Sequence, residues 1–145
     1  MNKKLQLLIK LDSNYKINLL TPDEIIKKLY IIGDRIEYVI DPTEEMQLIA
    51  VISNGLALKC INNPSDKVIH KAVKSYGMAI KFVDNQTEEL QLLALEDSGN
   101  LLEYIRQPTK LARLKAINAN MNAFRYIDDP TEEEQLMAVT DAPYL

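Results

Sequence analysis

The sequence has few of the residues on which chemistry and cross-linking usually depend. Its 145 residues include one cysteine, one histidine, no tryptophan and four glycines. A single cysteine, Cys60, cannot form an internal disulfide, which favours a reducing compartment and a cytoplasmic location. With one histidine, His70, no metal-ligand spacing and no glycine-rich phosphate loop, the chain offers no catalytic constellation. We therefore expect no enzymatic activity and no cofactor.

Long apolar runs and an excess of positive charge are also lacking. No stretch approaches the roughly 18 apolar residues of a membrane span, so we expect no membrane insertion. The formal net charge is −4 and the pI is near 5.1. Nucleic acids and membrane surfaces attract basic faces, so constitutive binding to either is not expected.

What the sequence does have is an internal repeat of 22 residues. It reads DPTEEMQLIAVISNGLALKCI from Asp41, and related segments begin at Asn63, Asn85 and Gln107, with a shortened copy at Asp129. Repeats of this length indicate stacked supersecondary units. The pattern predicts an all-α fold, a right-handed α-solenoid of about five and a half helix-turn-helix units over residues 21–145. The predicted units are 21–41, 42–63, 64–85, 86–107, 108–129 and 130–145.

Each unit is expected to hold a longer helix of about 11 to 12 residues, a turn, and a shorter helix of six to eight residues. Segments such as Thr21-Pro22-Asp23-Glu24 and Asp41-Pro42-Thr43-Glu44 combine a capping side chain, a proline and a glutamate, which predicts a helix start with Thr21 or Asp41 as the N-cap. On this alignment the first unit is two residues short.

Glycine follows the longer helix at Gly55, Gly77 and Gly99, which predicts a left-handed helix end there. Met121 replaces it in one unit, so a looser or differently closed turn is expected at that place.

The longer helices carry alanine at one recurring place, followed by a branched residue, which predicts close helix packing. The alanines are Ala50, Ala72, Ala94, Ala116 and Ala138. The shorter helices are apolar nearly all round, so each should be packed between its neighbours. They are expected at 56–61, 78–83, 100–105 and 122–127.

Residues 1–20 differ from the repeats and are expected to cap the stack. Leu5, Leu7, Ile9 and Leu11 alternate with other residues, as do Tyr15, Ile17 and Leu19 after them. This alternation favours a β-hairpin, although a short amphipathic helix is an alternative.

The repeat is similar to a short helical repeat found in strings in largely uncharacterised proteins of bacteriophages, large DNA viruses and some bacteria. The shared pattern starts with Asn/Asp-Pro-Ser/Thr-Glu-Glu, continues through Gln-Leu and Ala-Val, and turns at Asn-Gly. The resemblance covers 41–139 well and 21–40 weakly. It implies an α-solenoid and a phage or mobile-element origin, a setting in which small proteins often bind and block a host defence protein in the host cytoplasm. It carries over no catalytic residues.

Most candidate functional residues have an ordinary structural interpretation. The paired acids at Glu44, Glu88 and Glu132 are expected to favour helix starts. Recurring glutamines at Gln47, Gln91 and Gln135 are expected to be solvated helix formers, with a hydrogen-bonding ladder as the alternative. His70 replaces leucine and is expected to be partly buried at the edge of the core. Cys60 replaces an aromatic residue and is expected to be a small buried thiol.

The most specific functional hypothesis concerns two adjacent positions of the short helices, where charged and aromatic residues recur. A packing ladder and a solvated face are the simpler interpretations; the functional one is a recognition strip for another protein. The candidate residues are Glu37, Tyr38, Lys59, Lys81, Phe82, Glu103, Tyr104, Arg125 and Tyr126.

Two alternatives to protein binding remain open from the sequence. Lys67, Lys71, Lys74 and Lys81 make one unit basic and acidic units resemble phosphate, which would suit nucleic-acid binding or mimicry. The bare half-repeat at the C-terminal end of the sequence would suit self-assembly or a homodimer.

Overall fold

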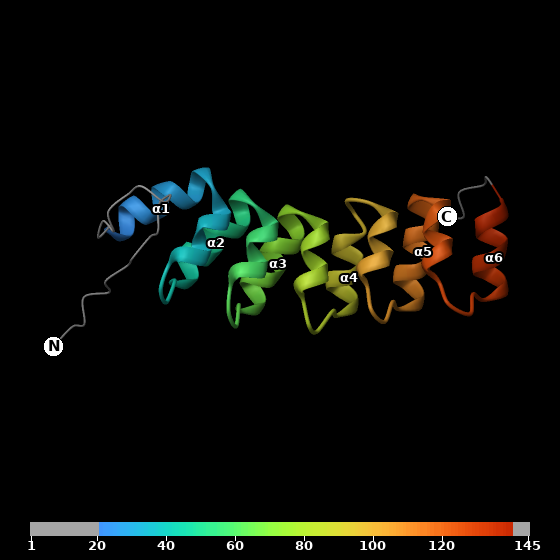
Figure 1. Ribbon diagram of the computed structural model, residues 1–145. Helices are drawn as coiled ribbons and strands as arrows, with labels where there is room; N and C mark the ends of the chain where they lie inside the picture. Colours follow the sequence, from blue (N-terminus) through green and yellow to red (C-terminus); the bar gives the residue numbers. More distant parts are fainter. Residues whose placement is uncertain (1–20, 141–145) are drawn as a thin grey trace. The chain divides into compact units, whose positions relative to one another are not determined.

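The computed structural model describes residues 21–140, and within that range every regular element is a helix (Figure 1). The expected all-α class is therefore confirmed for the described residues, while the predicted hairpin lies in 1–20, outside them. None of the described helices is long and apolar enough to cross a membrane. Five short 3₁₀ helices, labelled η, alternate with six α-helices. In chain order they are α1 (Pro22–Ile31), η1 (Gly33–Tyr38), α2 (Glu44–Ser53), η2 (Gly55–Cys60), α3 (Asp66–Ser75), η3 (Gly77–Phe82), α4 (Glu88–Ala94), η4 (Gly99–Tyr104), α5 (Lys110–Ala119), η5 (Met121–Tyr126) and α6 (Glu132–Val139).

The chain divides into two compact units, the first ending at Ser75 and the second beginning at Tyr76. In the first unit α2 packs between α1 and α3, and η1 packs against η2. In the second unit α5 packs between α4 and α6, and η4 packs against η3 and η5. Each unit thus has a layer of α-helices and a layer of 3₁₀ helices, and each of the first five repeats supplies one helix of each kind.

The shorter helices begin one residue earlier than expected and are 3₁₀ helices, not α-helices. They close with hydrogen bonds from residue i+3 to residue i, as from Ile61 N to Leu58 O at 3.1 Å. This tighter winding buries Ala57, Leu58 and Ile61, but it leaves Lys59 exposed and Cys60 half-buried. The short helices are therefore not enclosed all round, and the fifth and sixth residues of each form an accessible edge.

The α-helices are also shorter than expected, with seven to ten residues each. Helix α1 begins at Pro22 after Thr21, as predicted, but α2 begins two residues later than a cap at Asp41 would imply. Thr43, not Asp41, caps α2, and its side chain accepts a hydrogen bond from Met46 N. Asp41 instead takes a left-handed conformation with φ of 50°, as do Asn63 and Asp129, each just before a proline. When the repeats are aligned on the residues that cap the α-helices, all have the same spacing, so the first repeat is not two residues short. These cap residues are Thr21, Thr43, Ser65, Thr87, Thr109 and Thr131.

The glycines do not end the α-helices in a left-handed conformation, because no described glycine has a positive φ. The preceding residue is extended, as at Tyr76 with φ of −160° and ψ of 107°, and glycine begins the 3₁₀ helix. Glycine is needed because a backbone carbonyl approaches: a Cβ at Gly77 would lie 2.5 Å from Ala94 O. Met121 follows an Asn120 of the same extended geometry, φ −160° and ψ 110°, so the looser turn expected there is wrong.

Four of the five recurring alanines lie in the core, as expected. Ala50, Ala72, Ala94 and Ala116 are fully buried, and the branched residues after them are at most 2% exposed. In α6 the same positions differ: Ala138 is half-buried and Val139 is 80% exposed. Among the described residues α6 packs against α5 and η5.

Candidate functional site

The predicted recognition strip lies at the fifth and sixth residues of the 3₁₀ helices. In the first unit it consists of Glu37, Tyr38 and Lys59, all exposed, on the adjacent helices η1 and η2. In the second unit it consists of residues on η3, η4 and η5, which also pack side by side. These are Lys81, Phe82, Glu103, Tyr104, Arg125 and Tyr126. The structure thus brings the candidates together in two groups, one in each compact unit.

The aromatic rings of the second group are partly accessible and are contacted by cations. Phe82 is 36% exposed, and Tyr104 is half-buried. The ammonium of Lys81 lies 4.9 Å from the ring centre of Phe82 and 5.7 Å from that of Tyr104 on the next 3₁₀ helix. The guanidinium of Arg125 lies 4.9 Å from the ring centre of Tyr126. Such cation–π contacts hold long side chains in place at an accessible surface.

Cys60 is half-buried and not the fully buried thiol expected from the sequence. Burial, and then the negative charge of Glu37 on the adjacent 3₁₀ helix, raises the pKa of the Cys60 thiol. Because the thiolate is the reactive form, these surroundings make Cys60 a poor nucleophile at neutral pH.

His70 is half-buried, as its place at the edge of the core predicts. It lines an open groove of about 480 Å³ between α2 and α3, together with Leu48, Ile52, Lys67 and Lys71. That His70 and the two lysines share a groove with apolar residues was not predicted from the sequence.

The paired acids lie in the first turns of α2, α4 and α6, as predicted, where the helix dipole stabilises negatively charged carboxylates. Some also connect neighbouring helices. Glu44 accepts a hydrogen bond of 2.6 Å from the Ser65 hydroxyl and lies 3.9 Å from the Lys67 ammonium. Glu133 lies 2.8 Å from Lys110, and this hydrogen bond raises the pKa of the Lys110 ammonium.

The recurring glutamines are not simply solvated helix formers, so that expectation is wrong. Gln47 and Gln135 each donate from Nε2 to the carbonyl five residues earlier, at 3.1 and 3.0 Å. Gln91 is only 3% exposed and donates to the carbonyls of Gln86 and Gln107, while Thr109 N donates to its Oε1. Each glutamine thus holds the loop before its own helix in place, and at Gln91 the bonds also reach the next repeat, as the alternative of a hydrogen-bonding ladder predicts.

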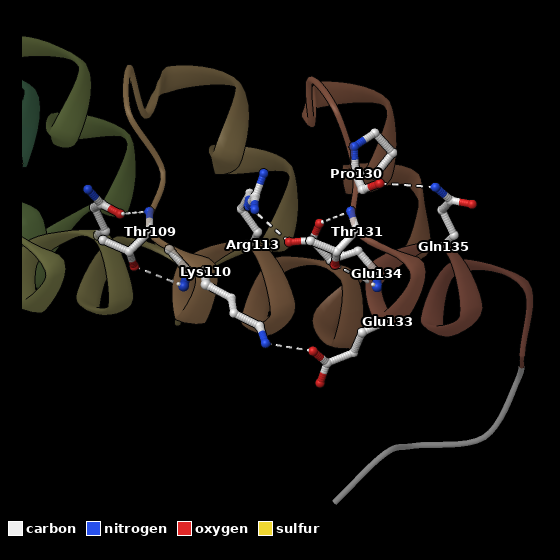
Figure 2. A network of polar contacts seen from close by, with 10 residues as sticks. Thr109, Lys110, Arg113, Pro130, Thr131, Glu133, Glu134 and Gln135 are labelled. Carbon is white, nitrogen blue, oxygen red and sulfur yellow. Dashed lines mark hydrogen bonds and ion pairs between the residues drawn. The ribbon is translucent and has the colours of Figure 1, made fainter.

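One buried ion pair was not predicted from the sequence. Glu134 is fully buried in the first turn of α6, and its Oε1 lies 2.9 Å from Arg113 Nε of α5 (Figure 2). Its Oε2 accepts a hydrogen bond of 2.8 Å from Thr131 N, which completes a capping box. Its burial could have been inferred from its position in the repeat, because Glu134 occupies the place held by Met46, Val68 and Ala112 in other repeats.

Comparison with models of protein families, with curated proteins and with solved structures gives no match for this chain.

Proposed function

We propose that this protein is a non-catalytic, right-handed α-solenoid that binds another protein through the exposed edge of its 3₁₀ helices. Within both compact units the main contacts join helices of the same or adjacent repeats, which is the packing expected of a solenoid. The resemblance to phage repeat proteins adds that the partner is a bacterial host protein, such as a defence protein, bound in the host cytoplasm.

The observation that carries this proposal is the position of Lys81 over two aromatic rings, Phe82 and Tyr104, on adjacent 3₁₀ helices. Aromatic and arginine side chains dominate the binding energy of many protein interfaces. Side chains that are already ordered lose less conformational entropy when a partner binds. The accessible edge of η3, η4 and η5 has both properties.

The test is affinity capture from a bacterial lysate with the tagged full chain and two variants. The strip variant carries Phe82→Ala, Tyr104→Ala and Arg125→Ala. The matched control carries Leu111→Ala and Leu136→Ala, which change α-helical side chains that are 52% and 51% exposed. Circular dichroism first establishes that both variants are folded.

We expect one host protein to be retained by the wild type and the control and to be lost by the strip variant. A direct titration with that protein should show at least a tenfold weaker affinity for the strip variant, about 1.4 kcal/mol or more. Equal affinity of the strip variant and the wild type would disprove the proposed surface.

A further inference from the structure

Helix α3 carries a basic stripe that no other described α-helix has. Lys67, His70, Lys71 and Lys74 follow the spacing i, i+3, i+4, i+7, which places them on one face of the helix. The corresponding positions of the next repeat hold Glu89, Leu92, Leu93 and Glu96. The basic stripe is thus a property of one helix and not of the repeat, in a chain whose net charge is −4.

The stripe borders an apolar surface contributed by the neighbouring helix. Leu48 and Ile52 of α2 form one side of the α2–α3 groove, and Lys67, His70 and Lys71 form the other. Ile52 is 48% exposed although it is a large apolar residue. Glu44 is an acidic side chain paired with the stripe, and its carboxylate lies 3.9 Å from the Lys67 ammonium with both groups exposed. A pair of this kind is weak and is easily exchanged for another partner.

We infer that the α2–α3 groove is a docking site for an acidic amphipathic helix of a partner protein. Leu48 and Ile52 are four residues apart, as are Lys67 and Lys71. Each side of the groove is therefore lined by residues that lie about one helical turn apart. A helix laid into the groove would place apolar residues with i, i+4 spacing against Leu48 and Ile52. Its carboxylates would lie beside Lys67, Lys71 and Lys74.

The apolar side of the groove distinguishes this partner from a nucleic acid. Phosphate groups would satisfy the lysines, but a sugar–phosphate backbone is mostly polar and offers little apolar surface to cover Ile52. An acidic amphipathic helix satisfies both sides at once. The groove lies in the α-helical layer of the first unit, so it is a second surface, separate from the 3₁₀ edge proposed above.

The test uses the full chain labelled with ¹⁵N and a synthetic helical peptide of about 14 residues, with leucines at i, i+4 and i+7 flanked by glutamates. We expect the peptide to shift amide resonances of α2 and α3. Replacing its glutamates with glutamines should weaken binding about tenfold, as should the Lys71→Glu/Lys74→Glu variant, because charge attraction is removed or reversed. The control variant Lys27→Glu/Lys28→Glu carries the same charge change on two lysines of α1, one exposed and one half-buried as in the test variant, and should bind as the wild type does.

Several results would overturn the inference. They are the absence of shifts at millimolar peptide, shifts confined to other helices, and equal binding by the Lys71→Glu/Lys74→Glu variant. Stronger shifts of α3 amides with a mixed-sequence oligonucleotide than with the peptide would assign the stripe to nucleic acid. Shifts of the same amides on simple concentration of the protein would assign the groove to a second copy of the chain.

Discussion

Arg113 of α5 and Glu134 of α6 form a buried ion pair, with 2.9 Å between Nε and Oε1. Glu134 has no exposed surface, and the Arg113 side chain is 20% exposed. The two atoms have no hydrogen-bond partner of regular geometry among the described residues, so charge attraction accounts for the pairing. A second ion pair between α5 and α6, Lys110 with Glu133 at 2.8 Å, is exposed, so Arg113 and Glu134 form the buried one of the two.

We expect Arg113→Met to destabilise the second unit by about 3 kcal/mol, because it leaves the carboxylate of Glu134 buried without a counter-charge. The double variant Arg113→Met/Glu134→Gln should recover most of this loss, since glutamine is neutral and still suits a capping box. Urea unfolding, with hydrogen exchange of the α6 amides, measures both. Additive losses in the double variant would show that the two residues do not depend on each other.

We expect Gly99→Ala to destabilise the protein by about 2 kcal/mol, because a Cβ there would overlap the backbone carbonyl of Ala116. The matched control is Met121→Ala, at the corresponding position of the next repeat, where the side chain is 47% exposed. That change should alter stability by less than about 0.5 kcal/mol. Thermal unfolding of both variants checks the prediction, which fails if the two changes have equal effects.

Asn63 offers a test of backbone conformation, because its φ is 50°. Asn63→Ala should cost about 1 kcal/mol, since a left-handed conformation is unfavourable for alanine. Asn63→Gly should stay within about 0.5 kcal/mol of the wild type. If alanine were tolerated as well as glycine in urea unfolding, the left-handed assignment would be wrong.

Glu24 predicts a pH dependence at the start of α1. Its hydrogen bonds to the backbone and side chain of Thr21 lower the pKa of the carboxyl below its ordinary 4.5. A lowered folded-state pKa gives stability that is fully present above pH 4.5 and is lost as the pH falls through the folded value. The stability difference between wild type and Glu24→Gln should therefore be constant from pH 7 to 5 and shrink below pH 4.5. Thermal unfolding over that range measures it, and a constant difference down to pH 3 would contradict the capping role.

The 22-residue period was sufficient to predict alternating longer and shorter helices and the buried alanines. It did not predict where each helix begins, because Asp41 and Thr43 are both good capping residues and lie on either side of Pro42. Only the three-dimensional structure shows that Asp41 is left-handed and Thr43 is the cap. Likewise, a segment of six residues such as Gly55–Cys60 is too short for its apolar pattern to separate a 3₁₀ helix from an α-helix.

Only part of the candidate site could be predicted, because a repeat shows which residues recur but not which of them are in contact. Residues that recur at one position, such as Tyr38 and Tyr104, can be grouped from sequence alone. Contacts between unlike residues of neighbouring repeats cannot, because they depend on which positions face each other. Lys81 over Tyr104, Arg113 beside Glu134, and the groove formed by Ile52 with Lys71 all belong to this second kind.

The contacts of α6 with α5 limit how such a gene could change by recombination between its own repeats. When α2 and α5 are aligned on their cap residues, Glu44 of α2 corresponds to Lys110 of α5, and Gln47 corresponds to Arg113. An unequal crossover that joined α6 directly after α2 would place Glu133 near Glu44 and leave Glu134 buried without an arginine. Although the backbones of the repeats are alike, loss of the intervening units would therefore be selected against, and the order of the repeats would be preserved.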